Sequence, residues 1–168
     1  MTSKRLLVAF SVLVVMLTIA GAVSFVRYAR YHEPNPQLVA VAPFDIFVPG
    51  FDPWRVRLAE GLTEQLGTMP PLGAVPQAVV RERWRGQSRP EIAALDLARR
   101  TSAGLAVYGR VDPIAGKSDS IRVQMIVVEA GTGRVALMID RPWQVGDLAA
   151  LPRALAEQVR QNYRYPRD

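Results

Sequence analysis

The longest apolar stretch of the chain lies near its start and contains no charged residue. It covers 21 residues, from Leu6 to Val26. At 1.5 Å per helical residue, such a stretch spans about 30 Å, the thickness of a bilayer's hydrocarbon core. The pattern therefore predicts one membrane-spanning helix over residues 6–26, preceded by a short N-terminus of residues 1–5.

Both flanks of this stretch carry basic and aromatic side chains of the kind that lie at a membrane interface. These residues are Lys4, Arg5, Arg27, Tyr28, Arg30 and Tyr31. The basic residues are almost equally divided between the two ends, but a short basic N-terminus before a long exported domain is the usual signal-anchor arrangement. We therefore expect a single-pass protein of the bacterial inner membrane with its C-terminal domain in the periplasm. Contact with lipid or pigment is expected only at this helix.

A cleaved signal peptide is the alternative interpretation of the same stretch. Ala20-Gly21-Ala22 has the small-x-small pattern of a cleavage site, and the basic pair before the run fits a charged n-region. The apolar run continues past this site to Val26, which is longer than a signal peptide requires. Its length favours an uncleaved anchor.

After the span, the pattern predicts a linker, one domain and a tail. Pro34 and Pro36 favour extended structure, so residues 27–37 are expected to form a linker. Residues 38–160 are long enough for one domain. Residues 161–168 are expected to form a C-terminal tail.

In the first half of the domain, the sequence pattern predicts alternating strands and helices. The apolar run Leu38–Phe44 indicates a buried strand. Asp52 as N-cap and Pro53 at the first position then predict a helix that ends near Gly67. Its apolar stripe at four-residue spacing is Trp54, Leu58, Leu62 and Leu66. A brief strand over 73–76 and a helical turn over 77–85 are expected to follow.

In the second half of the domain, the sequence pattern predicts a helix, three consecutive strands and a last helix. Ser88-Arg89-Pro90-Glu91 is typical of a capping box that starts a helix ending near residues 102–104. The strands are expected over 105–111, 121–129 and 134–141, with a hairpin turn at Gly131-Thr132-Gly133. The last helix is expected from about Asp147 to Tyr163. The order β-α-β-α-β-β-β-α predicts an α/β domain with a mixed sheet and helices packed on it.

Charge and composition exclude several classes of site. The net charge is +6, but four basic residues flank the span, and the other 17 basic and 15 acidic residues leave +2, which is no nucleic-acid footprint. The chain has no cysteine, which excludes disulfides and thiolate sites. Its single histidine, His32, has no second nitrogen or thiolate ligand to complete a metal site. We expect no metal and no cofactor held by side-chain ligands.

Four carboxylates come nearest to a catalytic arrangement: Asp45, Asp52, Glu60 and Glu64. Asp52 is explained as a helix cap. Glu60 and Glu64 lie four residues apart on one helix, where Arg55 and Arg57 favour a solvated face of ion pairs over an acid pair in a cleft. No glycine spacing indicates a phosphate-binding loop. We therefore expect no catalytic residues and no enzyme activity.

Two segments combine arginine with aromatic residues, as interface anchors often do. The candidate partner-binding residues are Arg81, Arg83, Trp84 and Arg85 in the middle of the domain, and Tyr163, Arg164, Tyr165 and Arg167 in the tail. The alternative interpretation is that Trp84 packs on the core beside solvated arginines. For the tail, the alternative is a frayed terminus.

Several short motifs together resemble the TolB amino-terminal-like domain, which is also found fused to bacterial adenylate cyclases, kinases and TPR proteins. The matching motifs are Pro43-Phe44, Gly61-Leu62-Thr63-Glu64, Val107-Tyr108-Gly109-Arg110-Val111, Val123-Gln124-Met125-Ile126-Val127 and Gly131-Thr132-Gly133, with a closing helix at Ala149 to Val159. The resemblance covers nearly all of residues 38–160. The arginine-rich segment Gln77–Gln87 departs from the family's pattern. The family implies a binding or scaffolding module and offers no catalytic residues to carry over.

These observations predict a non-catalytic, membrane-anchored accessory or scaffolding subunit. Its partners are expected to be the bilayer and subunits of a larger membrane protein complex, with no nucleic acid. The host complex is expected to be a photosynthetic or respiratory one, although no residue selects it. The alternative function is an envelope signalling or sensory binding module.

Overall fold

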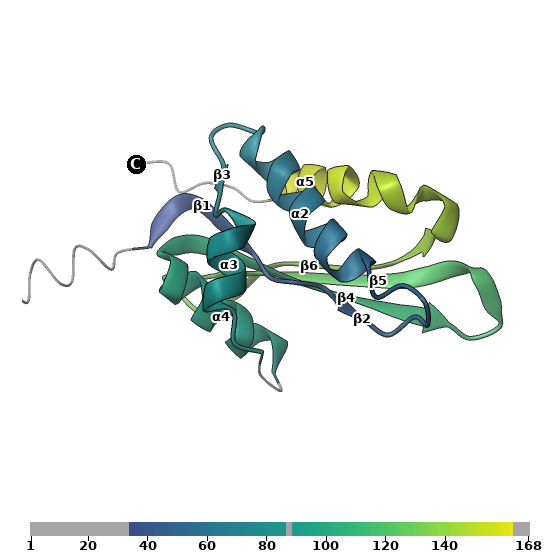
Figure 1. Cartoon of the computed structure of the whole chain (residues 1–168). Helices are drawn as coiled ribbons and strands as arrows, with labels where there is room; N and C mark the ends of the chain where they lie inside the picture. The colour runs from purple at the N-terminus through teal and green to yellow at the C-terminus, as the bar shows by residue number, and fades with distance from the viewer. Residues whose placement is uncertain (1–33, 87–88, 163–168) are drawn as a thin grey trace, which may run out of the picture. The chain divides into compact units, whose positions relative to one another are not determined.

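The chain divides into two units, Met1–Glu33 and Pro34–Asp168. The computed structural model describes residues 34–86 and 89–162, all in the second unit (Figure 1). The elements are β1 (Asn35–Val41), β2 (Asp45–Ile46), α2 (Trp54–Gly67), β3 (Gly73–Ala74), α3 (Gln77–Arg83), α4 (Pro90–Thr101), β4 (Ala103–Ile114), β5 (Lys117–Glu129), β6 (Val135–Gln144), the 3₁₀ helix η1 (Val145–Ala150) and α5 (Leu151–Asn162). None of the described helices is long and apolar enough to span a membrane. The span predicted at 6–26 lies outside the described residues.

One mixed sheet forms the centre of the domain, with the strand order β3-β1-β4-β5-β6. β1 pairs in parallel with β3 and with β4, while β4, β5 and β6 form an antiparallel meander. β2 also pairs in parallel with β4, beyond β1 along the same edge. Ala42 N–H donates to Val107 O and Phe47 N–H donates to Val111 O, so β1 and β2 follow one strand edge on either side of a break at Pro43-Phe44.

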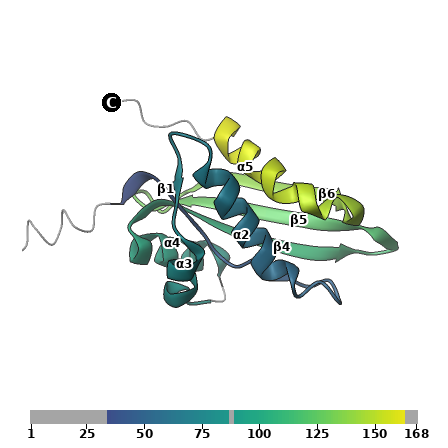
Figure 2. The same ribbon diagram turned by 45° about the horizontal axis from the view of Figure 1, so that its top comes forward.

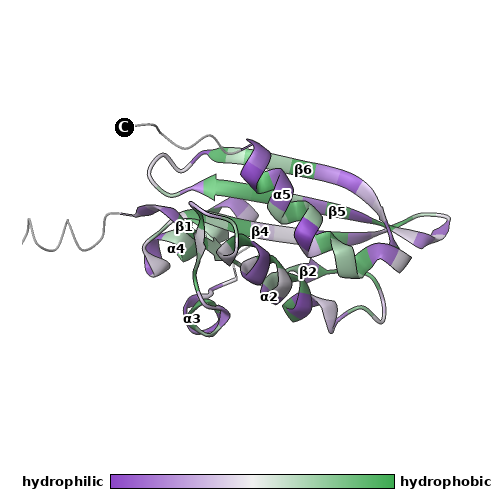
Figure 3. Ribbon diagram, turned by 90° about the horizontal axis from the view of Figure 1, so that it is seen from above, coloured by the Kyte–Doolittle hydropathy of each residue, from purple (hydrophilic) through white to green (hydrophobic). Residues whose placement is uncertain are grey.

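Leucine-rich helices cover one face of the sheet. α2 and α5 lie side by side over β4, β5 and β6, and apolar strand residues lie beneath them (Figures 1, 2 and 3). The buried helix residues there include Leu58, Leu62 and Leu66 of α2, and Leu151, Leu155 and Val159 of α5. A Cβ on Gly61 of α2 would lie 3.0 Å from Pro152 Cγ of α5, so glycine lets the two helices approach closely.

Smaller residues line the contact on the opposite face, where α3 and α4 pack. Ala94 and Ala98 of α4 cluster with Ala106 of β4 and with Ala130, which follows β5. Ala40 and Ala42 cluster instead with Val80 of α3 and Leu97 of α4. Short side chains let a helix lie close to a sheet at little cost in packing volume. Figure 1 shows that α3 and α4 cover only part of this face and leave the end toward β2 and the β4–β5 hairpin uncovered.

Two glycines of β4 lie where a side chain would meet another part of the fold. A Cβ on Gly109 would lie 2.0 Å from Cε1 of the Phe44 ring, which is fully buried. A Cβ on Gly104 would lie 2.4 Å from Pro36 Cα and 2.5 Å from the Asn35 carbonyl oxygen. Phe44 therefore packs directly on the β4 backbone, and the start of β1 lies against Gly104.

The α/β class and the mixed sheet are confirmed, but the order of elements is wrong. β2 was not expected, and the expected last helix consists of η1 followed by α5, which ends at Asn162. β1 begins at Asn35, inside the segment expected as a linker. β2 has two residues only and follows the Pro43-Phe44 break, so it leaves no periodic pattern.

Two helix starts also differ from expectation. The N-cap of α2 is Pro53 and that of α4 is Arg89, and neither helix has a side-chain cap hydrogen bond. Asp52 therefore does not cap α2, and Ser88 of the expected capping box lies outside the described residues. Instead, the Asp52 carbonyl oxygen accepts from Arg55 N–H at 3.1 Å, within a backbone turn.

Candidate functional site

The uncovered part of the α3/α4 side of the sheet is the candidate site, and we call it the open face. Side chains alternate between the two faces of a strand, so the residues on the same side as Ala106 and Ile126 define it. They are Tyr108, Arg110 and Asp112 of β4, Arg122 and Gln124 of β5, and Met138 and Asp140 of β6. Phe47, just after β2, borders the open face because the Arg110 guanidinium carbon lies 4.6 Å from its ring centroid.

Two bidentate ion pairs cross the open face. Arg110 Nε donates to both carboxylate oxygens of Asp112 at 2.9 and 2.7 Å. Arg122 Nε and Nη2 donate to Asp140 at 2.6 Å each. Gln124 Nε2 donates to the same Asp140 carboxylate at 3.0 Å. Hydrogen bonds to Asp112 and to Asp140 raise the pKa of Arg110 and of Arg122, respectively. Hydrogen bonds from Arg122 and then Gln124 lower the pKa of Asp140, so the Arg122–Asp140 pair is ionised at neutral pH.

Tyr108 joins the open face to the covered part of the sheet. Its hydroxyl donates to Asp45 Oδ2 at 2.5 Å, and its ring stacks on Trp84 with centroids 6.4 Å apart. Burial, followed by the hydrogen bond to Asp45, raises the pKa of Tyr108 well above its usual range. The phenol therefore stays protonated and acts as a hydrogen-bond donor that fixes β2 against β4.

We expect Tyr108→Phe to lower the free energy of unfolding by about 1.5–3 kcal/mol, the range for a hydrogen bond to a charged group. Because the pKa of the folded phenol is raised, its contribution is present below about pH 10 and is lost as the pH rises through the folded pKa. Urea denaturation at neutral pH measures the change. Asp45→Asn keeps an acceptor oxygen and should cost less, and an equal or larger loss in Asp45→Asn would contradict this account.

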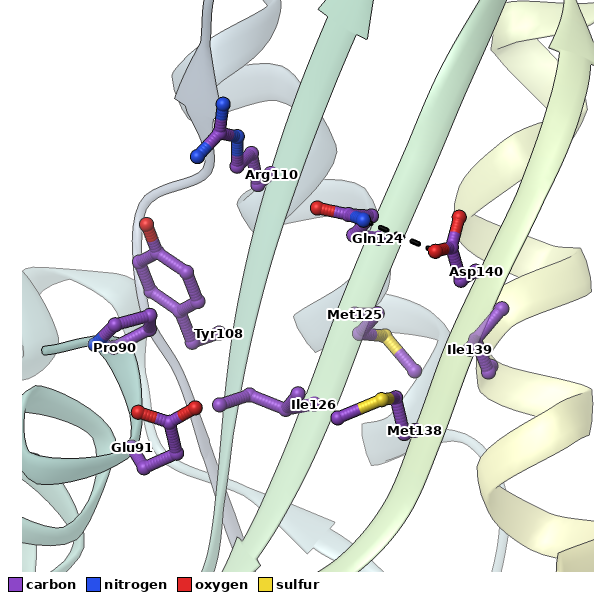
Figure 4. Close-up of a pocket in the computed structure, with 10 residues that line it drawn as sticks. All are labelled: Pro90, Glu91, Tyr108, Arg110, Gln124, Met125, Ile126, Met138, Ile139 and Asp140. Atoms are coloured by element: carbon purple, nitrogen blue, oxygen red, sulfur yellow. Dashed lines mark hydrogen bonds between the residues drawn. The ribbon is translucent and has the colours of Figure 1, made fainter.

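A pocket of about 190 Å³ lies between the start of α4 and strands β4 to β6. Figure 4 shows Glu91, Ile126 and Met138 at one end, and Arg110, Gln124 and Asp140 at the other, with Tyr108 and Pro90 along one side. Ile126 is 8% exposed, whereas Met138 is 66% exposed. The pocket therefore has an apolar end open to solvent and a polar end whose charges are already paired.

Exposed apolar side chains of the described residues are concentrated on this side. Among the large hydrophobic residues, five are strongly exposed: Phe47, Val56, Ile92, Val135 and Met138. Phe47 and Met138 lie on the open face or at its border, and Val135 shares their side because it pairs with Val128. Apolar residues next to a polar, ion-paired strip have the composition of a protein–protein interface with a polar rim.

The structure places the arginine-rich candidate residues on and just after α3, and each of the three arginines has a hydrogen-bond partner within the domain. Arg81 Nη1 lies 2.9 Å from Glu60 Oε1, and Arg83 donates to the carbonyl oxygen of Arg100. Arg85 Nη1 donates to the carbonyl oxygens of Glu82 and Trp84 at 3.2 Å. Trp84 is half-buried and packs against a buried cluster that includes Val80 of α3 and Leu97 of α4. Trp84 reaches the open face through Tyr108, and the three arginines do not line its pocket.

The remaining candidate residues lie outside the described part of the chain. These are Tyr163, Arg164, Tyr165 and Arg167 of the tail, and Lys4, Arg5, Arg27, Tyr28, Arg30 and Tyr31 beside the expected span. Their roles stay predictions.

The carboxylates considered for catalysis are not brought together. Asp45 accepts a hydrogen bond from the Tyr108 hydroxyl. Glu60 forms an ion pair with Arg81, although the sequence suggested Arg55 and Arg57 as its neighbours. Arg55 lies 4.0 Å from Asp45 instead. Across residues 34–86 and 89–162, no group of three or more histidine, cysteine, aspartate or glutamate side chains is placed to hold a metal ion.

The sequence contains one signal for the open face. In 121–129, Arg122 and Gln124 alternate with buried residues, so one side of that strand had to be polar. The pattern does not reveal that α4 covers only part of this side of the sheet and leaves Arg122 and Gln124 uncovered. The Gly-Leu-Thr-Glu motif has a structural role in this domain. Leu62 is buried. The Thr63 hydroxyl donates a hydrogen bond to the Ala59 carbonyl oxygen and accepts one from Gln77 Nε2.

The chain was compared with protein families, curated proteins and solved structures. No family model matches it, and no curated protein matches it. Among solved structures, it is similar to TolB from Acinetobacter baumannii, with a TM-score of 0.53 and 10% identity over 78% of this chain. The match spans 29% of the TolB chain, so this chain corresponds to less than a third of that protein.

Two other solved structures have lower scores. The LpoB C-terminal domain from Salmonella enterica gives a TM-score of 0.48 and 14% identity, over 66% of this chain and 84% of that one. Lipoprotein GNA1162 from Neisseria meningitidis gives a TM-score of 0.48 and 18% identity, over 77% of this chain and 100% of that one. The expectation drawn from the short motifs is confirmed at the level of architecture: the domain has a TolB-like fold.

Proposed function

We propose that this protein is a non-catalytic accessory subunit that binds another protein through its open face. The observation that carries the proposal is Met138, a large apolar side chain that is 66% exposed on the part of the sheet that no described helix covers. Exposed apolar groups gathered on one side of a domain are typical of interaction sites. The ion pairs around Met138 are satisfied within the domain, which suits the rim of an interface.

The N-terminal sequence supports a location at a membrane. The apolar run of residues 6–26 fits an uncleaved anchor of the bacterial inner membrane, with the domain on the periplasmic side. The proposed partner is a subunit of a larger membrane protein complex, and a photosynthetic or respiratory complex remains the proposed host. In this arrangement, the anchor keeps the domain at the membrane and raises its effective concentration near a membrane-bound partner.

We expect Met138→Glu to weaken partner binding about tenfold, because it places a charge at the apolar centre of the interface. The matched control is Val56→Glu, since Val56 is another exposed apolar residue and lies on α2, which covers the opposite face. The full chain, tagged and purified in mild detergent, is tested for co-purifying subunits, which are quantified for the wild type and both variants.

The supporting result is a partner recovered with the wild type and with Val56→Glu but lost with Met138→Glu. If the wild type recovers no stable partner, the accessory function is wrong. If Val56→Glu releases the partner and Met138→Glu does not, binding occurs through the α2 side and the open face is not the site.

A further inference from the structure

The pocket on the open face has an uneven distribution of unpaired charge. At its polar end, Arg110 is held by Asp112, and Asp140 is held by Arg122 and Gln124. Each of these pairs is neutral as a unit. At the apolar end, Glu91 is exposed and forms no hydrogen bond or ion pair with the residues that the structure describes. The charge left for a ligand is therefore negative, and it lies beside Ile126 and Met138 (Figure 4).

We infer that this pocket receives a basic side chain, lysine or arginine, from the partner protein. The inference rests on the proposed docking function and names the chemistry of the group that the pocket accepts. Lysine and arginine bury their aliphatic stems on apolar surface while the charged head reaches a polar group. Here the stem lies on Ile126 and Met138, and the head pairs with the Glu91 carboxylate.

The same contacts disfavour an anionic ligand. An anion in the pocket meets the Glu91 carboxylate at the apolar end. At the polar end, the charge of Arg110 is already balanced by the Asp112 carboxylate, which accepts from Arg110 Nε at 2.7 and 2.9 Å, so little net positive charge is left to attract an anion. Bidentate arginine–carboxylate pairs are among the stronger polar contacts in proteins. The pocket therefore selects a cation with an apolar stem.

The test uses butylguanidinium as a probe of the basic side chain and butyrate as the same stem with the opposite charge. The full chain in detergent micelles is labelled at its methionine methyl groups, and the Met138 resonance is followed by NMR. We expect a saturable shift of this resonance with butylguanidinium and none with butyrate. Added salt should weaken the binding, since both charges are close to solvent.

Variants of glutamate decide whether Glu91 holds the cation. Glu91→Gln is expected to weaken butylguanidinium binding about threefold or more, the size of a good surface ion pair. Glu64→Gln, an exposed glutamate on α2, is expected to leave the binding unchanged. The inference is wrong if butyrate binds as well as butylguanidinium, if neither gives a saturable shift, or if the two variants have equal effects.

The probe experiment and the co-purification experiment test different claims, so a failure of one can be told from a failure of the other. If Met138→Glu releases the partner but butylguanidinium does not bind, the open face is still the docking site and the basic side chain is excluded. If butylguanidinium binds but the partner is insensitive to Met138→Glu, the docking site itself is wrong, and the pocket does not serve it.

Discussion

Replacing Gly109 with alanine is expected to lower the free energy of unfolding by about 3 kcal/mol or more. A Cβ at this position would lie 2.0 Å from Cε1, 2.3 Å from Cδ1 and 2.5 Å from Cζ of Phe44. Overpacking a core costs about 1–3 kcal/mol and occasionally more. The upper end applies here, because the ring is fully buried and has no solvent-side space into which to turn.

Urea denaturation followed by circular dichroism measures this loss for Gly109→Ala. Gly146→Ala is the matched control, since a Cβ there meets nothing within 4 Å and its backbone does not have a positive φ. A second variant tests the cause. In Phe44→Leu, the ring is gone, so adding Gly109→Ala should cost clearly less than it does in the wild type. Equal costs in the two backgrounds would show that the Phe44 ring is not the obstacle.

Gly104→Ala is expected to be the second most damaging of these changes, at about 2–3 kcal/mol. Its Cβ would lie 2.4 Å from Pro36 Cα and 2.5 Å from Asn35 O, so the obstacle is backbone and no side-chain rotation relieves it. The start of β1 would have to move away from β4. The hydrogen bond from Asn35 N–H to Ser102 O, at 2.9 Å, would then be lost.

Amide hydrogen exchange distinguishes the two glycine variants. In Gly104→Ala, protection should fall first at the start of β1, and the β5–β6 pairing should keep its protection relative to the lowered global stability. Gly131→Ala is the control, because a Cβ there meets nothing within 4 Å. Unchanged stability in Gly104→Ala would mean that β1 does not lie as close to Gly104 as the structure has it.

Elements with strong local periodicity could be predicted from the sequence. The four-residue spacing of Leu58, Leu62 and Leu66 gave α2 with its end at Gly67, because a helix with one apolar stripe needs no distant partner to be recognised. The Gly131-Thr132-Gly133 turn likewise indicated the β5–β6 hairpin, and Gly133 has a φ of +68° there. These features depend on neighbours along the chain.

Features that depend on distant residues could not be predicted. Tyr108 bonds Asp45, 63 residues earlier, and nothing near either residue indicates that contact. For Trp84, the sequence left open an interface anchor or a side chain packed on the core, and it did not indicate the stacking on Tyr108. The open face depends on where α4 ends relative to β5 and β6, which is a matter of tertiary packing rather than of periodicity.

The position of β4 in the sheet has a consequence for how the chain acquires its structure during synthesis. β1 is made first, but its neighbour β4 comes after α2, α3 and α4, so Val41 can pair with Val107 only once that later segment has emerged. The β4–β5–β6 meander needs only contacts close in sequence and should form quickly. We therefore expect the β4–β5–β6 meander to form first and β1 to pair with it afterwards. A domain exported N-terminus first would expose the apolar β1 segment until β4 arrives, the interval in which a chaperone would have most to bind.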